Sequence, residues 1–197
     1  MKKPRHRRHP TAALPGFVCL LLCLTLTQPA ATASPAYHIE ISKSQRVLQL
    51  KQAETIIKQY HIAYGKGGDG TKKRSGDNKT PLGHYKVVEF KADSKFHFFI
   101  LLNYPNLLDA WHGYQDQVIN AAEFRDIASA HKFEESPPQD TGLGGYIGIH
   151  GIGKATKEKL DIHQEHNWTE GCIAMRNNEI TELRKMVTIG MPVTITE

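Results

Sequence analysis

Residues 146–175 read YIGIHGIGKATKEKLDIHQEHNWTEGCIAM, and this stretch contains a histidine and a cysteine that both lie next to glycines. His150 ends a short apolar run that is typical of a buried strand. Cys172 follows Gly171 and precedes the apolar Ile173. A glycine before a nucleophile lets the backbone approach closely and lets amide groups face a reacting oxygen. The stretch therefore predicts Cys172 as a nucleophile, with His150 as its partner.

The expected chemistry is that of an activated thiol. A cysteine attacks as the thiolate, so it needs a neighbouring base or cation, and an imidazole held at a strand end supplies either. We therefore expect a partly exposed Cys172 with thiolate character and His150 as its general base. Sequence alone leaves other roles open, because a lone thiol is also compatible with a buried structural residue or an intermolecular disulfide.

A zinc site is the main alternative at the same residues. His150, His163, His166 and Cys172 offer three imidazoles and a thiolate, which are ligands that zinc accepts. His163 and His166 are three residues apart, a spacing that fits one helical face. The set does not follow a known zinc spacing, however, and residues 163–168 resemble a polar loop. We therefore expect no metal or other cofactor, and we interpret His163 and His166 as surface histidines.

The N-terminus has the pattern of a secretory signal peptide. Residues 1–10 carry five lysines or arginines and no acid, and residues 12–27 are apolar without a charge. Ala31-Thr32-Ala33 then offers the small residues that a signal peptidase recognises. The apolar run is short for a membrane anchor and contains Pro15 and Gly16, which favours cleavage after Ala33 over anchoring. We expect residues 1–33 to be removed, leaving residues 34–197 as one exported domain of the periplasm or cell envelope.

The charge balance excludes some classes of partner. The whole chain has 25 basic and 20 acidic residues, and five of the basic ones lie in residues 1–33. Residues 34–197 therefore have a formal net charge of zero. This balance gives no reason to expect binding to nucleic acid or to an anionic membrane. Of the three cysteines, Cys19 and Cys23 leave with the N-terminal segment, so Cys172 is the only thiol of the expected mature domain.

Elsewhere the pattern is one of short strands and few helices. Gly, Lys and Asp dominate residues 65–80, which predicts a loop. Two segments have helical spacing of apolar residues, 116–132 and 177–187, whereas 104–111 looks irregular and 134–145 looks like a linker or lid. The pattern predicts a mixed, mainly β domain. The expected strands are 37–42, 47–50, 56–64, 84–90, 96–102, 146–150 and 191–196.

Several motifs of the chain resemble the L,D-transpeptidase catalytic domain (YkuD-type) of bacterial envelopes. That family shows an Ile-His-Gly strand end and, further along, a Ser/Thr-His-Gly-Cys-Ile/Val motif. It also shows a Gly-Asp-x-x-Thr-Pro-x-Gly-x-Phe/Tyr element and a characteristic opening strand. The matching residues here are Ile149-His150-Gly151, Thr169-Glu170-Gly171-Cys172-Ile173, Gly76 to Tyr85, and Ser44 to Leu48. The resemblance implies a β-sandwich with a few helices.

The resemblance also implies a reaction and a substrate. Members attack the stem peptide of peptidoglycan at a carbonyl next to a D-amino acid, form a thioester, and pass the acyl group to an amine. Carried over, Cys172 is the nucleophile and His150 the base, and the carbonyl of Gly151 orients the imidazole. Amide groups around Gly171 and Cys172 would stabilise the oxyanion. The implied partners are peptidoglycan stem peptides and a peptidoglycan-linked protein.

Two residues depart from the common motif. Glu170 replaces the usual histidine, and Ala174 replaces the usual arginine or asparagine. Trp168-Thr169-Glu170-Gly171-Cys172 resembles a branch of the family in which hydrolysis of peptidoglycan-linked amides also occurs. We therefore expect acyl transfer, with amide hydrolysis and a non-catalytic wall-binding module as alternatives. Trp168, Glu170 and Arg176 are the candidate substrate-binding residues.

Overall fold

The computed structural model describes residues 36–92 and 95–197. The expected signal peptide, residues 1–33, lies outside the described residues and stays a prediction. Within the described ranges, no helix is both long and apolar enough to cross a membrane.

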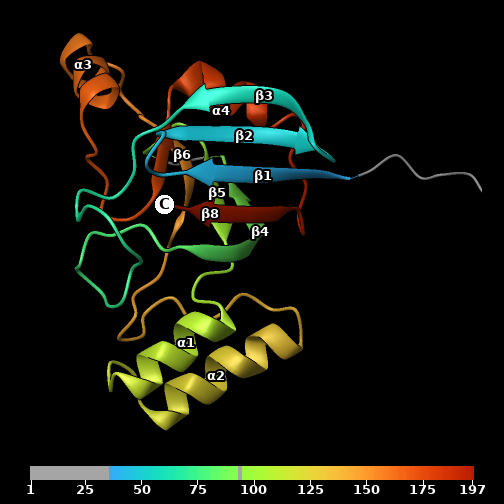
Figure 1. The fold of residues 1–197 in the computed structure, drawn as a ribbon, viewed down its shortest axis with the longest axis vertical. Coiled ribbons are helices and arrows are strands. Elements are labelled where there is room, and N and C mark those ends of the chain that lie inside the picture. The colour runs from blue at the N-terminus through green and yellow to red at the C-terminus, as the bar shows by residue number, and fades with distance from the viewer. Residues whose placement is uncertain (1–35, 93–94) are drawn as a thin grey trace, which may run out of the picture. The chain divides into compact units, whose positions relative to one another are not determined.

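The described residues form a mainly β domain, as predicted. The strands form one sheet in the order β3-β2-β1-β8-β4-β5-β6-β7. Figure 1 shows β3, β2, β1, β8 and β4 one below the other, with β5 and β6 drawn behind them. The strand bounds are close to the predicted ranges, and the short β7 has no predicted counterpart. The strands are β1 (Tyr37–Ser42), β2 (Val47–Gln52), β3 (Thr55–His61), β4 (Gly83–Lys91), β5 (Phe99–Leu102), β6 (Gly148–Gly151), β7 (Ile173–Met175) and β8 (Pro192–Thr196).

The two ends of the sheet are brought together. Strand β4 pairs with β8 over its first half and with β5 over its second half, and its register shifts between Val87 and Glu89. Residues that follow β3 then form bridges near β7, joining Ala63 to Ala174 and Gly65 to Thr169. The sheet therefore folds back on itself, and the apolar faces of both halves share one buried core. This arrangement agrees with the expected β-sandwich.

Two predicted strands begin later than the apolar pattern suggested. Strand β5 starts at Phe99 rather than at residue 96, after His97 has adopted a φ of 77°. Strand β6 starts at Gly148 rather than at residue 146, after Tyr146 has adopted a φ of 54°. A left-handed residue cannot continue the extended backbone of a strand, so each run begins only beyond it.

Two helices occupy the segment between β5 and β6. Helix α1 (Leu107–Gln115) overlaps residues 104–111, so the prediction of an irregular segment was wrong. Asn106 starts this helix, because its side chain accepts from two helical amides while Asp109 accepts from the Asn106 N–H. The helix predicted for 116–132 begins only at Ala121, as α2 (Ala121–Lys132), capped in the same way by Asn120. In Figure 1 the two helices lie side by side, beyond β4.

The other two helices flank the strand that follows the cysteine. Helix α3 (Lys157–Glu165) was missed by the sequence pattern, which showed a polar segment ending in a loop. Its inward face includes a histidine rather than a row of apolar residues, so the hydrophobic periodicity is weak. Helix α4 (Asn177–Leu183) lies at the predicted place and is shorter than predicted, because the chain continues to Val187 in tight turns.

Candidate active site

Cys172 and His150 line one cavity of about 590 Å³. Four segments form its wall: the loop before β4, the residues before β5, the segment that leads into β6, and the loop between α3 and β7. The two residues that the sequence pattern singled out are thus brought to a common site. Strands β6 and β7 explain this arrangement, because they pair in parallel, with His150 one residue before the end of β6 and Cys172 directly before β7.

The imidazole of His150 is held in one tautomer. Its Nδ1 lies 2.7 Å from the carbonyl oxygen of Gly151. A carbonyl can only accept a hydrogen bond, so Nδ1 carries the proton and Nε2 keeps its lone pair. A side chain at position 151 would not fit, because its Cβ would lie 2.6 Å from the Phe96 carbonyl oxygen. The hydrogen bond to the Gly151 carbonyl is the contact through which the resemblance expects the imidazole to be oriented.

Aromatic rings enclose this imidazole. Phe96 stacks on it at 4.2 Å between ring centroids, Phe99 lies parallel at 5.8 Å, and Trp168 meets it edge-on at 6.0 Å. His150 is only 2% exposed. This burial lowers the pKa of His150 to about 4, against the opposing hydrogen bond to Gly151. At neutral pH the side chain is uncharged and able to accept a proton.

Cys172 is half-buried, which confirms the expected partial exposure. Its Sγ–H donates to the carbonyl oxygen of Tyr146 at 3.2 Å. Burial raises the pKa of the Cys172 thiol to about 11, and the Glu170 carboxylate adds a smaller upward shift. The Gly148 N–H and the Lys72 ammonium act in the opposite direction. The predicted thiolate character is therefore wrong for the resting protein, which holds a neutral thiol.

The loop that carries Cys172 depends on Gly171. This residue has a φ of 134°, and a Cβ there would lie 2.8 Å from the carbonyl oxygen of Lys79. Only glycine combines that backbone angle with so close an approach. The Thr80 hydroxyl fixes the contact, because it donates to the Gly171 carbonyl oxygen at 2.8 Å and accepts from the Gly65 N–H at 2.9 Å.

A second threonine braces the cysteine itself. The Thr169 hydroxyl donates to the Cys172 carbonyl oxygen at 2.6 Å and accepts from the Gly171 N–H at 3.2 Å. The resemblance implied that the Gly171 N–H helps to stabilise an oxyanion. In the structure this N–H donates to the Thr169 hydroxyl. The Thr169 hydroxyl therefore braces the loop that carries Cys172 from within, whereas Thr80 ties that loop to the segments around residues 65 and 80.

The loop of residues 65–80 is irregular, as predicted, but it is ordered by a buried ion pair. The Asp77 carboxylate accepts from the Lys72 ammonium at 2.9 Å and from the backbone amides of Lys73, Arg74 and Lys79. Lys72 is itself buried and lines the cavity. The Gly-Asp-x-x-Thr-Pro element thus shapes one wall of the site.

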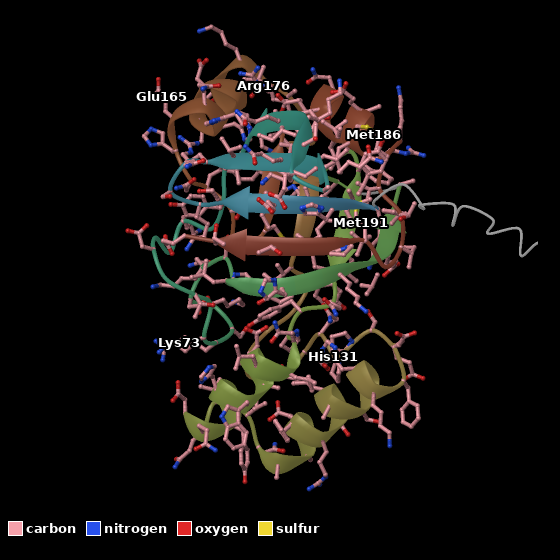
Figure 2. The ribbon with its side chains drawn as sticks, turned by 45° about the vertical axis from the view of Figure 1, so that its right-hand side comes forward. Lys73, His131, Glu165, Arg176, Met186 and Met191 are labelled. Atoms are coloured by element: carbon pink, nitrogen blue, oxygen red, sulfur yellow. The ribbon has the colours of Figure 1, made fainter. Side chains whose placement is uncertain are left out.

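Two of the three candidate substrate-binding residues lie at the cavity. Trp168 and Glu170 both line it, and Glu170 is exposed there. Arg176 is not among the lining residues, and its guanidinium donates to the Gln164 side chain at 2.8 Å. Figure 2 shows Arg176 at the start of α4, on the same side of the sheet as Glu165 at the end of α3. The structure therefore gives Arg176 a contact with α3 and does not place it at the cavity.

The histidines of the zinc alternative do not converge on Cys172. His163 is fully buried, so its interpretation as a surface histidine was wrong. Its Nδ1 accepts from the Trp168 indole N–H at 3.4 Å, and its ring meets His61 edge-on. His166 is exposed just after α3, as expected for a surface residue. Among the residues that the structure describes, no three His, Cys, Asp or Glu side chains are grouped to hold a metal ion.

Three groups at the site were not identified from the sequence. Phe96 encloses the histidine, the Tyr146 carbonyl accepts the thiol hydrogen, and Thr80 supports Gly171. Only Thr80 carried a signal, since it belongs to the Thr-Pro-x-Gly element. Backbone carbonyl contacts such as that of Tyr146 depend on tertiary geometry and leave no mark in a residue pattern.

Comparison with known proteins agrees with this geometry. Residues 36–195 match the model of the L,D-transpeptidase catalytic domain, YkuD. The chain belongs to this family. YafK of Escherichia coli K12, whose provisional name is that of an L,D-transpeptidase, is 38% identical over 161 residues, covering 79% of this chain and 48% of YafK. The protein of the same name from Escherichia coli O157:H7 matches equally. The chain thus spans about half the length of these curated relatives.

Two solved structures show the same fold. Pgp2 of Campylobacter jejuni, described as a helical cell shape determining protein, has a TM-score of 0.54 at 24% identity, over 82% of this chain and 48% of Pgp2. Bd1075 of Bdellovibrio bacteriovorus has a TM-score of 0.50 at 23% identity, over 83% of this chain and 48% of Bd1075. At these identities the likeness establishes the fold, which confirms the predicted sandwich.

Proposed function

We propose that the protein is a cysteine acyltransferase that acts on peptidoglycan stem peptides through a thioester on Cys172. The observation that carries the proposal is the neutral His150, held on the Gly151 carbonyl at the same cavity as the Cys172 thiol. Membership of the L,D-transpeptidase family supports peptidoglycan as the substrate. The proposed location is the periplasm or cell envelope, to which the expected signal peptide would direct the protein.

The proposed first half-reaction forms the thioester. The thiol proton passes to Nε2 of His150 while the sulfur attacks the stem-peptide carbonyl next to a D-amino acid. Cys172 starts as a neutral thiol, so proton transfer must accompany attack rather than precede it. The imidazolium then gives its proton to the departing amine, the C–N bond breaks, and the acyl group stays on sulfur.

The second half-reaction transfers the acyl group. An amine attacks the thioester and His150 takes the amine's proton. The carbon–sulfur bond then breaks, and the imidazolium returns that proton to the departing sulfur, which restores both the thiol and the neutral base. The Gly151 carbonyl stabilises the transient imidazolium through its 2.7 Å hydrogen bond to Nδ1. The acceptor amine belongs to a second stem or to a peptidoglycan-linked protein in this proposal.

Hydrolysis is the second candidate, and Glu170 is the observation that favours it. This exposed carboxylate lines the cavity next to the nucleophile loop. A carboxylate there could hold a water molecule in position to attack the thioester, or repel a substrate carboxylate. Both reactions share the acyl-enzyme, so they differ only in whether an amine or water accepts the acyl group.

Isolated peptidoglycan and an added D-amino acid distinguish the two reactions. The purified protein should incorporate the added amino acid or form new cross-links, detected by mass analysis of the digested fragments. Cys172→Ala should abolish either outcome. Free stems or released protein without any exchange would replace transfer with hydrolysis, and an unchanged digest would leave the non-catalytic wall-binding alternative.

The contribution of Glu170 is tested by Glu170→His, which restores the common motif. We expect the variant to shift the product ratio towards transfer, because it removes a carboxylate from the cavity. Glu158→His is the matched control, since Glu158 is exposed on α3 and does not line this cavity. Equal product ratios in Glu170→His and the wild type would show that Glu170 does not select the acceptor.

A further inference from the structure

The carbonyl oxygen that accepts the thiol hydrogen belongs to a residue with an unusual backbone. Tyr146 has a φ of 54°, in the left-handed region that costs a non-glycine residue about 1 kcal/mol. Its side chain is 59% exposed, so no buried packing of the ring enforces this conformation. The Lys91 ammonium lies 5.6 Å from the ring centroid, which is a weak surface contact. Some other group must hold the backbone of Tyr146.

Gln139 is that group. Its Oε1 accepts from the Tyr146 N–H at 2.6 Å, and its Nε2 donates to the carbonyl oxygens of Tyr104 at 3.0 Å and Pro137 at 2.7 Å. Two carbonyl acceptors and one N–H donor fix the orientation of the side-chain amide. The reverse orientation would place Oε1 against the two carbonyl oxygens and the NH₂ group against the Tyr146 N–H. The Gln139 side chain therefore connects three backbone groups: the Tyr104 carbonyl just before α1, the Pro137 carbonyl in its own loop, and the N–H of Tyr146, whose carbonyl contacts the sulfur.

The backbone of the same loop closes tightly around this bridge. A Cβ on Gly145 would lie 2.3 Å from the Gln139 carbonyl oxygen, so the two segments touch through their main chains. The buried Tyr104 hydroxyl also donates to the Leu143 carbonyl oxygen at 3.2 Å. Residues 139–146 thus form a closed turn whose end, Tyr146, lies on the cavity.

We propose that Gln139 is a positioning residue of the reaction, which holds the Tyr146 carbonyl against the Cys172 thiol and so fixes the resting orientation of the nucleophile. This role rests on the proposed assignment of Cys172 as the nucleophile. The carbonyl accepts from the protonated sulfur and offers nothing to a thiolate, so the bridge stabilises the neutral thiol. The other polar groups that act on the sulfur are the Gly148 N–H, Lys72 and Glu170, whereas the Gln139 side chain hydrogen-bonds to Tyr104, Pro137 and Tyr146.

Gln139→Met tests the bridge in the full-length chain. Methionine keeps the length of the side chain and removes all three hydrogen bonds. Loss of the Tyr146 acceptor should lower the midpoint of Cys172 alkylation by iodoacetamide by about one pH unit, so the thiol reacts about tenfold faster at pH 8. Acyl transfer on peptidoglycan should instead fall about tenfold, because the sulfur is no longer held in one orientation. A purely structural role would not make the thiol more reactive while it makes the enzyme slower.

Gln59→Met is the matched control, since the exposed Gln59 side chain on β3 hydrogen-bonds to Gln49, and both rates should equal those of the wild type. Gly145→Ala disturbs the same bridge through the backbone and should shift the alkylation midpoint in the same direction. The alkylation assay needs no peptidoglycan. If the wild-type protein showed no transfer on peptidoglycan while Gln139→Met still lowered the alkylation midpoint, the bridge would be supported and the proposed reaction rejected. An unchanged or raised midpoint in folded Gln139→Met, checked by its thermal unfolding, would overturn the inference.

Discussion

At the scale of single residues, the site keeps the proton acceptor, His150, and the proton donor, Cys172, both uncharged before the proposed reaction begins. His150 is buried among aromatic rings and is kept neutral, whereas Cys172 is kept as a thiol. A neutral pair avoids placing two charges in a partly apolar cavity before substrate arrives. The charges then develop only when the sulfur attacks, where the Gly151 carbonyl and the Gly148 amide are already in place.

The low pKa of His150 predicts the acid limb of the activity. Protonation removes the base, so kcat/KM should fall only as pH drops through about 4 and should be unaffected near pH 6.5. Rates on a soluble stem peptide, measured from pH 3.5 to 8, give the profile. Phe96→Ala opens the aromatic enclosure and should move the limb towards 6.5. A wild-type limb already at 6.5 would contradict the buried, neutral histidine.

At the scale of structural elements, the loop before β4 supports the loop that carries the cysteine. Thr80 is fully buried, and its hydroxyl joins the Gly65 N–H to the Gly171 carbonyl oxygen. Both residues are glycines, so neither has a side chain that could anchor its backbone. The support is polar and buried, so it is sensitive to the loss of a single oxygen atom.

Thr80→Val should therefore weaken both stability and activity. Valine preserves the shape and leaves a buried N–H and C=O without their partner, which costs about 2 kcal/mol in the free energy of unfolding. Urea titration followed by circular dichroism measures this loss. The exposed Thr188 provides the control, because Thr188→Val should change the unfolding free energy by less than about 0.5 kcal/mol. Equal stabilities of the two variants would reject the bracing role of Thr80.

Helix α3 is attached to the sheet by polar contacts. The Arg46 guanidinium from the β1–β2 turn donates to the carbonyl oxygens of Ile62, His163, Gln164 and His166. His163 then faces inward against His61 and Trp168. Because Trp168 lines the cavity, this attachment connects the helix to the site.

This attachment should weaken in acid. Burial lowers the pKa of His163 to about 4, so between pH 6.5 and 4 the unfolded chain binds a proton that the folded chain does not. The contribution of His163 is complete above pH 6.5 and is lost as pH falls through 4, a decrease of about 2–3 kcal/mol. His163→Phe should reduce the pH dependence of the unfolding free energy by that amount, whereas His166→Phe, at an exposed position, should keep the wild-type dependence.

At the scale of the whole described domain, the last strand completes the sheet. Strand β8 lies between β1 and β4, parallel to the first and antiparallel to the second. It therefore connects β1 to β4, the strand shared by both halves of the sheet, and Val193 and Ile195 place their side chains in the common core. The last strand of the chain thus lies at the centre of the sheet, a feature with large loop-closure cost and no local signal.

Substitution in β8 should be costly on one face only. Ile195→Ala should lower the free energy of unfolding by about 3 kcal/mol, because it leaves a cavity between the two halves of the sheet. Thr194→Ala, on the opposite face of the same strand, should cost less than about 1 kcal/mol. Similar losses for the two variants, in chemical denaturation, would contradict the assignment of β8 as a central strand.

The sequence by itself determined the mainly β character of the domain and the positions of most strands, and it named Cys172 and His150 as the candidate pair, which the structure places at one cavity. Alternation of apolar residues marks a strand locally, and the glycines beside the two reactive residues reflect local backbone demands. Tertiary structure alone decided the protonation states, the burial of His163 and the contacts of Thr80, Gln139 and Tyr146 with the nucleophile loop. These features depend on desolvation and on contacts between backbone groups of distant segments. Neither can be predicted from a residue's identity or from its neighbours along the chain.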